Sequence, residues 1–282
     1  MKKVNYDINI DKLELQYLLT HEIASVLDEI EDIRDFYEFE IKRTNSNKNY
    51  KNTFEIILKL HDVEIGVYDV KFATLYYGSF NPIRNQMYIS IENRELYSKN
   101  LVSIHYIEDE LNLQFMTISK IDIAFDCDCN LINRYYKLIK NDNINYIVLN
   151  KKVDKNEEIS ILNCGKGSLL KPYINKSFYI KNKEGGLELN AYNKSLEIRD
   201  NDYNKQYIAD WLGFDNIHRL EVRCNHKQLK DTLRSLNLTD EDVLYRAILD
   251  KDLLFLIYTN LLNRILRVDD NNEIYNFLKY VV

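Results

Sequence analysis

Hydrophobic and polar positions divide the chain into helical and extended stretches. Between Leu13 and about Phe39, apolar residues recur at helical spacing and acidic residues occupy the other face. This pattern predicts an amphipathic helix pair or one long helix. The polar stretch 44–51 then predicts a loop. Three later stretches alternate or run apolar and are rich in β-branched and aromatic residues, which predicts strands over 54–60, 63–70 and 87–91.

The middle of the chain predicts further strands and one helix. Residues 119–127 have a strand pattern, and residues 131–140 have the 3.6-residue period of a helix that packs back on the sheet. Two short apolar stretches, 177–180 and 187–192, flank Gly185 and Gly186, and a double glycine is a strong signal for a hairpin turn. Tyr192 is therefore expected at the exit of a hairpin strand. Residues 217–223 predict one more strand.

The last part of the chain has a helical pattern. Helices are predicted over 227–236, 239–247, 251–267 and 272–280. Thr239 is the expected N-cap of the second of these, because acidic residues fill the turn that follows it. We therefore expect an α+β protein with a largely antiparallel central sheet that carries the active site, flanked by helices. Its expected parts are an N-terminal helical segment (1–50), a central domain (51–225) and a helical C-terminal part (226–282).

The overall charge argues against one class of function. The chain has 282 residues and a formal net charge of −6, whereas a protein that coats nucleic acid nonspecifically is usually basic. A local basic groove remains compatible with this charge, because phosphate contacts depend on where the cations lie. Lysines crowd the stretch before Tyr192, and the predicted DNA contacts are Lys166, Lys171, Lys176, Lys181 and Lys183, with Lys151, Lys152 and Lys155 nearby in sequence. The alternative is a solvated loop or hairpin face.

The cysteines and the apolar runs bear on the compartment. The four cysteines, Cys127, Cys129, Cys164 and Cys224, have no paired CxxC spacing, and the first residues lack the apolar core of a signal peptide. No apolar run approaches the roughly 20 residues of a membrane helix. The expectation is a reduced, cytoplasmic protein with no membrane partner.

Carboxylates lie among the apolar residues of two predicted strands. In KIDIAFD (120–126) side chains alternate across the strand, so Asp122 and Asp126 share one face. In HRLEVR (218–223) the same alternation puts Arg219, Glu221 and Arg223 on one face. If the two strands are neighbours, three acids and two guanidinium groups share a polar surface.

This polar surface is a candidate site for a metal and a phosphate. Mg²⁺ and Mn²⁺ prefer hard oxygen ligands and keep positions open for phosphate oxygens, so Asp122, Asp126 and Glu221 are the candidate ligands. Arg219 and Arg223 would hold the phosphate in a planar fork. The alternative is a solvent-facing sheet with cross-strand salt bridges, which are common and contribute little.

Tyr192 is a candidate nucleophile. A phenol has a pKa near 10, so its oxygen needs a metal, a base or a nearby cation to react as a phenolate. Lys194 is such a cation. A covalent phosphotyrosine would conserve the energy of a broken phosphodiester for later rejoining. The alternative is that Tyr192 is an ordinary strand residue, as most of the 22 tyrosines must be. His218 is expected to be a structural, hydrogen-bonding residue.

Taken in order, three segments resemble the replication initiation proteins of rolling-circle plasmids and related mobile elements, the Rep-trans type, which includes some conjugative relaxases. The segments are KIDIAFD (120–126), SFYIKNKEGGLELNAYNKSLE (177–197) and HRLEVR (218–223). The family pattern is an R/K-hydrophobe-D-hydrophobe-x-x-D strand, a hairpin that ends in Tyr-Asp/Asn-Lys-x-x-Glu, and an R-hydrophobe-E-hydrophobe-R strand. The resemblance covers roughly residues 50–225. Asn193 stands where Asp is commoner in the family.

The resemblance implies a site-specific endonuclease that nicks one strand of an origin and stays joined to the 5′-phosphate. It implies that Tyr192 is the nucleophile, that Lys194, Arg219 and Arg223 contact phosphate, and that Mg²⁺ or Mn²⁺ is bound by or near the three acids. The implied partner is double-stranded origin DNA with an extruded hairpin; a host helicase and a second copy of the chain are further candidates. Two alternatives stay open: a sequence-specific DNA-binding regulator that lacks nuclease activity, and a structural or interaction protein.

Overall fold

The structure of the protein is a computed structural model. It describes residues 4–46, 49–62, 66–79, 85–98, 101, 103–139, 144–153, 177–181, 185–201, 203–270 and 273–281. The chain divides into two compact units: unit 1 contains residues 1–10 and 121–282, and unit 2 contains residues 11–120. Strands β1 (Tyr6–Leu18) and β7 (Gln114–Cys127) contain residues of both units. This division differs from the expected boundaries near 50 and 225, because both of those positions fall inside a unit.

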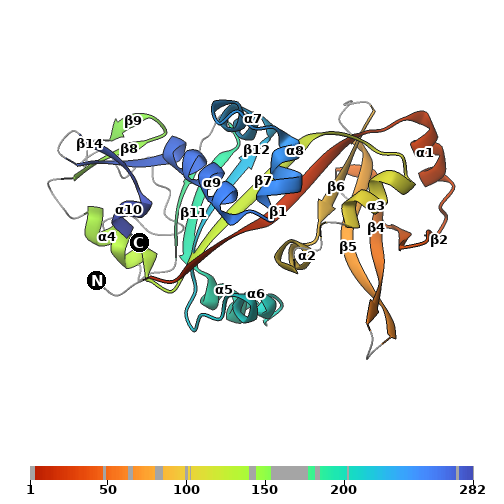
Figure 1. The fold of residues 1–282 in the computed structure, drawn as a ribbon, viewed down its shortest axis with the longest axis horizontal. Coiled ribbons are helices and arrows are strands. Elements are labelled where there is room, and N and C mark those ends of the chain that lie inside the picture. The colour runs from red at the N-terminus through yellow and green to blue at the C-terminus, as the bar shows by residue number, and fades with distance from the viewer. Residues whose placement is uncertain are drawn as a thin grey trace. The chain divides into compact units, whose positions relative to one another are not determined.

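Unit 2 is built on antiparallel strands (Figure 1). From β1 the strand order continues through β6, β5, β4 and β3 to β2. The bounds of these strands are β2 (Ile33–Asp35), β3 (Phe39–Thr44), β4 (Tyr50–Asp62), β5 (Gly66–Ser79) and β6 (Gln86–Ile91). The helices of this unit are α1 (His21–Asp28), α2 (Asn93–Ser98) and α3 (Ser103–Glu110). The strands predicted over 54–60 and 87–91 are confirmed as parts of β4 and β6, and the one predicted over 63–70 is confirmed for 66–70 in β5, since 63–65 lie outside the described residues.

The helix or helix pair predicted between Leu13 and Phe39 is wrong for most of its length. Residues up to Leu18 belong to β1, and only His21–Asp28 is helical. The reason is a strand partner far along the chain, since Leu13 and Leu15 of β1 face Ile91 and Ile89 of β6. All four of these side chains are buried. Packing between strands has overridden a local pattern that was compatible with a helix.

Unit 1 carries two sheets. The strand order of the first runs β10 (Ser177–Lys181), β11 (Leu187–Asn193), β12 (His218–Asn225), β7 and β1. The second has the order β14 (Glu273–Asn276), β13 (Leu266–Asp270), β8 (Ile144–Val148) and β9 (Lys151–Val153). Its helices are α4 (Leu131–Ile139), α5 (Lys194–Asp200), α6 (Gln206–Leu212), α7 (His226–Ser235), α8 (Asp240–Asp242), α9 (Lys251–Ile265) and α10 (Leu278–Val281), and a π-helical turn spans Val243–Ala247. The predicted α+β class with a largely antiparallel sheet is confirmed.

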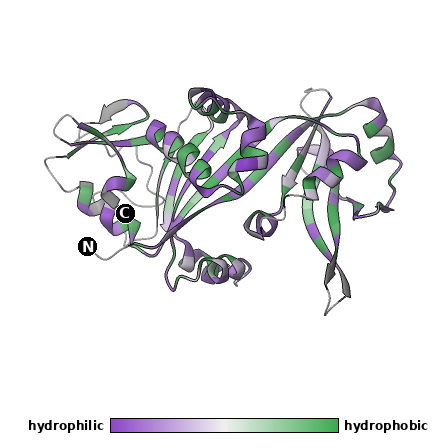
Figure 2. Ribbon diagram, in the orientation of Figure 1, coloured by the Kyte–Doolittle hydropathy of each residue, from purple (hydrophilic) through white to green (hydrophobic). Residues whose placement is uncertain are grey.

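The helices near the C-terminus cover the sheet instead of forming a separate part. Helix α9 packs against β11 and β12, and α7 packs against β12 (Figure 1). The hydroxyl of Tyr258 on α9 donates a hydrogen bond to the carbonyl of Leu220 on β12 at 2.9 Å. Figure 2 shows hydrophobic and hydrophilic residues interspersed along α9. The hydrophobic residues of α9 that are buried, such as Leu254, Ile257 and Leu261, form the core with the sheet.

Two predictions for the tail need correction. Helix α9 ends at Ile265, and the helix predicted over 272–280 is replaced by strand β14 and the short helix α10. Helix α9 stops at Ile265 because the next residues form β13, which pairs with the distant strand β8. Val268 of β13 faces Tyr146 of β8. Other predictions hold. Helix α7 is present, and Thr239 caps α8 in a capping box with Asp242.

The predicted hairpin is confirmed. Its turn ends at Gly186, a position where an added side chain would meet Asn225. Gly186 precedes β11 with φ +64°, and a Cβ there would lie 2.1 Å from Nδ2 of Asn225. The side chain of Asn225 caps α7 by accepting from the backbone N–H of Gln228. We expect Gly186→Ala to cost about 2 kcal/mol in the free energy of unfolding, from left-handed strain and a displaced cap. Gly213→Ala is the matched control, since Gly213 has φ +64° with nothing within 4 Å of an added Cβ. Urea unfolding of both variants measures the difference, and equal costs would contradict the steric argument.

Every helix in the described part of the chain is too short or too polar to cross a membrane. The described cysteines, Cys127, Cys129 and Cys224, are buried free thiols, and Cys164 lies outside the described residues.

Candidate functional site

The hairpin and the HRLEVR strand lie side by side in unit 1. Strand β11 pairs antiparallel with β12, and the register places Tyr192 opposite Arg219 and Asn190 opposite Glu221. Residues that face each other across an antiparallel pair project from the same side of the sheet. Tyr192 and the polar residues of β12 therefore share one face. The sequence argument, which assigned Arg219, Glu221 and Arg223 to one face by alternation, is confirmed.

A series of polar contacts joins Tyr192 to Asp122, the first acid of the KIDIAFD strand. The hydroxyl of Tyr192 donates to Oε2 of Glu221 at 3.0 Å, and Nε of Arg223 donates to Oε1 of the same carboxylate at 2.6 Å. The same Nε lies 3.6 Å from Oδ2 of Asp122 on β7. The Glu221 side chain is 1% exposed, whereas that of Arg223 is 45% exposed. The contacts thus run from a buried carboxylate to a guanidinium that reaches solvent.

Arg223 keeps its charge in this setting. Burial disfavours the charged guanidinium, but the hydrogen bond to Glu221 and the charges of Glu221 and Asp122 outweigh it and raise the pKa of Arg223 above its ordinary value. Arg223 therefore supplies a fixed positive charge between two carboxylates. A fixed guanidinium beside a hydroxyl is suited to bind a phosphate oxygen.

The second arginine lies in the interior. Arg219 donates from Nε to Oδ1 of Asp126 at 2.7 Å and from Nη2 to Oδ2 at 2.8 Å, and both side chains are 0% exposed. This is a bidentate pair, the strongest geometry open to these two groups. The alternative stated above, a solvent-facing sheet with surface salt bridges, is wrong for this pair, because the pair is buried. The polar residues of the site divide into a buried pair, Asp126 with Arg219, and a second set in which the buried Glu221 contacts Tyr192 and the partly exposed Arg223, with Asp122 beside Arg223.

Lys194 follows the tyrosine into the start of a helix. Its Nζ contacts Oε2 of Glu197 at 2.5 Å, and its side chain is 0% exposed. The same Nζ lies 5.7 Å from the centre of the Tyr192 ring. At this distance the ammonium makes a cation–π contact with the ring. Helix α5 starts here because the Asn193 side chain accepts from the backbone N–H of Leu196 at 2.9 Å and so caps it.

Sequence reasoning gave no role to Glu197, the last residue of the Tyr-Asn-Lys-x-x-Glu pattern, and it missed both helices, α5 and α6. The signal for Glu197 was present, since an acid three residues after Lys194 lies on the same side of a helix. Glu221 also has a role that was not foreseen, because it accepts a hydrogen bond from Tyr192.

His218 lies at the edge of the site and is buried, with 2% exposure. Its Nδ1 has no hydrogen-bond partner among the described residues, and Nε2 lies 3.3 Å from Nδ2 of Asn216. The expectation of a hydrogen-bonding residue holds for one ring nitrogen. Burial lowers the pKa of His218 from its ordinary value of 6.5.

This lowered pKa predicts a loss of stability in mild acid. As pH falls through 6.5, the unfolded chain takes up a proton on His218 before the folded protein does, so the free energy of unfolding decreases. Above that pH the contribution is fully present. We expect that in His218→Asn the free energy of unfolding changes less with pH between about pH 7.5 and 5. Urea unfolding at several pH values measures this change. His21→Asn, at an exposed histidine, is the control. An unchanged slope in the His218 variant would show that other groups cause the effect.

The predicted metal ligands differ in how well they fit a cation. Both oxygens of Asp126 accept from Arg219, whereas Asp122 and Glu221 lie on either side of one guanidinium nitrogen. Within the described ranges, no group of three or more His, Cys, Asp or Glu side chains is placed to hold a metal ion. Mg²⁺ is commonly bound by one or two carboxylates together with substrate phosphates. Both oxygens of Glu221 also accept hydrogen bonds, from Tyr192 and Arg223, so all three metal assignments stay predictions.

One predicted DNA contact falls on described residues. Lys181 ends β10, its side chain is 54% exposed, and its Nζ pairs with Glu188 of β11 at 2.9 Å. Lys166, Lys171, Lys176 and Lys183 lie outside the described residues.

The chain was compared with protein-family models, curated proteins and solved structures. No protein-family model matches the chain, and no curated protein matches its sequence. Among solved structures, it is similar to the rolling circle replication initiator protein from Geobacillus stearothermophilus, with 14% identity and a TM-score of 0.45. The alignment covers 93% of this chain and 86% of that chain. At this identity and score, the likeness identifies neither an activity nor a residue.

Proposed function

We propose that the protein initiates rolling-circle replication by nicking one strand of an origin, with Tyr192 as the nucleophile. The main support for this proposal is the hydrogen bond between Tyr192 and Glu221. The phenol hydroxyl donates to a carboxylate that is 1% exposed, and the other oxygen of that carboxylate is held by Arg223. A tyrosine whose hydroxyl already donates to a carboxylate can pass its proton to that carboxylate as its oxygen attacks.

The proposed chemistry is an exchange of one phosphodiester for another. As the Tyr192 oxygen attacks the phosphorus, its proton passes to Glu221, to which it is already hydrogen-bonded. The bond from phosphorus to the 3′-oxygen breaks, and that oxygen takes a proton from solvent to leave a 3′-OH. The 5′-phosphate stays on Tyr192 as a phosphodiester. In the reverse attack a 3′-OH loses its proton to solvent and rejoins the strand, the bond from phosphorus to the Tyr192 oxygen breaks, and the proton on Glu221 returns to the phenol oxygen.

The cations of the site have separate roles in this proposal. Arg223, which is partly exposed, contacts the scissile phosphate, and the buried Lys194 lies under the ring and stabilises the phenolate. Asp122 would hold Mg²⁺ or Mn²⁺ together with the substrate phosphate, which the metal would polarise when bound, and Glu221 keeps the role of proton acceptor. Arg219 supports the strand through Asp126.

Covalent capture on DNA tests the proposal. The full chain is incubated with Mn²⁺ and a labelled supercoiled plasmid that carries the DNA flanking its own gene. A denaturing gel is expected to show one nicked strand that migrates with the protein. The same plasmid without the flanking DNA is the control for sequence specificity.

Failure of the capture experiment separates the remaining alternatives. If the protein binds the flanking DNA in a gel-shift assay and forms no adduct, the nuclease proposal is overturned in favour of a DNA-binding regulator. If it neither binds nor nicks that DNA, a structural or interaction protein becomes the better description.

A further inference from the structure

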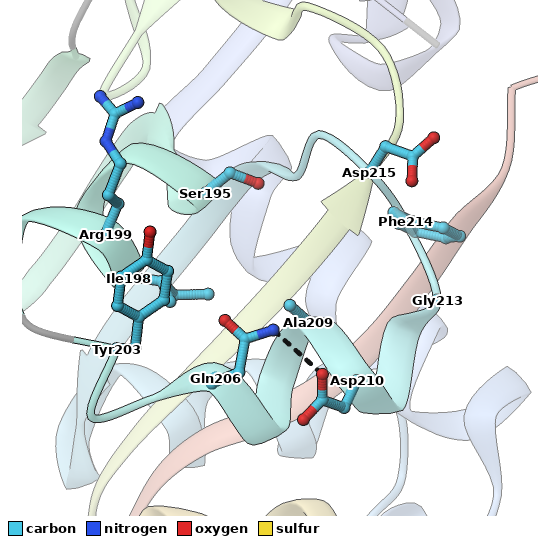
Figure 3. Close-up of a pocket in the computed structure, with 10 residues that line it drawn as sticks. All are labelled: Ser195, Ile198, Arg199, Tyr203, Gln206, Ala209, Asp210, Gly213, Phe214 and Asp215. Atoms are coloured by element: carbon cyan, nitrogen blue, oxygen red, sulfur yellow. Dashed lines mark hydrogen bonds between the residues drawn. The ribbon is translucent and has the colours of Figure 1, made fainter.

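A pocket of about 580 Å³ lies between helices α5 and α6 of unit 1 (Figure 3). Its lining includes Ser195 and Arg199 from α5, Gln206 and Asp210 from α6, and two aromatic residues, Tyr203 and Phe214. In Figure 3 the two aromatic residues stand on opposite sides of the pocket, and the Gln206–Asp210 hydrogen bond lies between them. The pocket has the size of a small-molecule site. None of these residues takes part in the chemistry proposed above.

We infer that this pocket receives one unpaired base of the DNA strand that Tyr192 attacks. The inference rests on the proposed function and specifies how that function selects its substrate. Proteins read an unpaired base by stacking it on aromatic side chains and by hydrogen-bonding its polar edge. The pocket offers both kinds of contact within one lining.

The polar residues of the pocket suit the edge of a base. Nε2 of Gln206 donates to Oδ1 of Asp210 at 3.0 Å, so the two polar groups lie together at the pocket. A carboxamide offers both a donor and an acceptor, and the carboxylate offers a second acceptor. Arg199 is 61% exposed and its Nε lies 3.9 Å from Oδ1 of the equally exposed Asp200, a loose surface pair that leaves the guanidinium able to contact a neighbouring phosphate.

The position of the pocket along the chain ties it to the nucleophile. Ser195 lines the pocket and is three residues after Tyr192. Its Cα therefore lies at most about 11 Å from that of Tyr192. A base bound here would belong to a nucleotide within a few positions of the scissile phosphate. Nicking requires this part of the strand to be single-stranded, so its bases are free to enter a pocket.

Binding of trinucleotides tests the inference without any nicking. The chain has one tryptophan, Trp211, on the same helix as Gln206 and Asp210. Its fluorescence is followed while full-length protein in EDTA is titrated with four trinucleotides, dT-dX-dT, in which dX is each base in turn. A fifth trinucleotide with an abasic centre keeps the phosphates and removes the base. We expect at least one base to bind about tenfold tighter than the abasic trinucleotide, as stacking on an aromatic side chain provides.

Two variants locate the effect in the pocket. Tyr203 has φ +60°, so Tyr203→Asn removes the ring with a residue that tolerates this backbone. Gln206→Ala removes the amide. Both are expected to bring the base-bearing and abasic trinucleotides to equal affinity, with circular dichroism unchanged. Tyr37→Ala, at a tyrosine that is 90% exposed, is the matched control and should keep the preference.

The possible outcomes separate this inference from the proposed nuclease. Equal affinity for base-bearing and abasic trinucleotides in the unmutated protein, or no binding of either, overturns the inference even if the covalent adduct forms. A preference that survives both pocket variants also overturns it, because the base then binds elsewhere. A preference that is lost in both variants supports the pocket, and it does so even if no adduct is ever captured.

Discussion

Replacing Tyr192 by phenylalanine is expected to abolish covalent joining to DNA while leaving DNA binding intact. The change removes one oxygen, and that oxygen is the proposed attacking atom. Loss of a nucleophile typically lowers a catalysed rate by roughly 10³-fold or more. Stability should change little, because the variant loses a single hydrogen bond, worth about 1 kcal/mol, from the buried carboxylate of Glu221. The measurement is the yield of the protein–DNA adduct on a denaturing gel, alongside a gel-shift assay for binding.

The matched control for this experiment is Tyr106→Phe. Tyr106 is 54% exposed on α3, and the same atom is removed from it. Adduct yield should match that of the unmutated protein. If Tyr192→Phe still forms the adduct at an undiminished rate, another residue is the nucleophile, and the contact with Glu221 is structural.

The parts of the fold that the sequence predicts well are those with local signals. The hairpin of β10 and β11 followed from a double glycine between two apolar stretches, and the structure pairs Phe178 with Ala191 across it. Helix α4 and helix α7 followed from a 3.6-residue period. These elements carry enough apolar residues at one spacing to be identified without knowledge of their neighbours.

The parts that sequence reasoning missed depend on distant partners. The stretch around Leu13 and Leu15 has apolar residues at both alternating and helical spacings, and pairing with β6 selects the strand. The stretch after Lys194 holds two short helices, and the pocket lies between them. No pattern in the sequence predicts this pocket. Residues of α5 and of α6, such as Ser195 and Gln206, line the same pocket because the turn between the two helices brings them together.

For the site, alternation predicted which residues share a face but not how they pair. It brought Arg219 and Arg223 together with the acids, and the structure agrees. It could not tell that one arginine is fully buried and the other partly exposed, since burial depends on the strands and helices packed around them. Arg219 and Arg223, which looked equivalent in HRLEVR, are therefore expected to differ in role.

The ion pair between Asp126 and Arg219 gives the largest expected effect on stability. Arg219→Met would leave the carboxylate of Asp126 buried without its bidentate partner, and Asp126→Leu would leave the guanidinium in the same state. Each single change is expected to cost about 3–5 kcal/mol in the free energy of unfolding. The double variant, Asp126→Leu with Arg219→Met, removes both charges and should recover most of that loss, because buried ion pairs are often replaceable by apolar residues. Urea unfolding followed by circular dichroism measures all three, and costs below about 1 kcal/mol for the single variants would contradict the burial of the pair.

The double variant also decides whether these two residues take part in the reaction. If Arg219 and Asp126 only hold β7 against β12, a stable double variant should still form the covalent adduct, because Tyr192, Glu221 and Arg223 are unchanged. If Arg219 contacts the phosphate or Asp126 binds the metal, the double variant will fold and bind DNA but form no adduct. The geometry favours the first result, since both oxygens of Asp126 accept from Arg219 and both side chains are 0% exposed. Arg223→Met, at the partly exposed arginine, is expected to lose the adduct, and it also costs stability because the buried carboxylate of Glu221 loses its cationic partner.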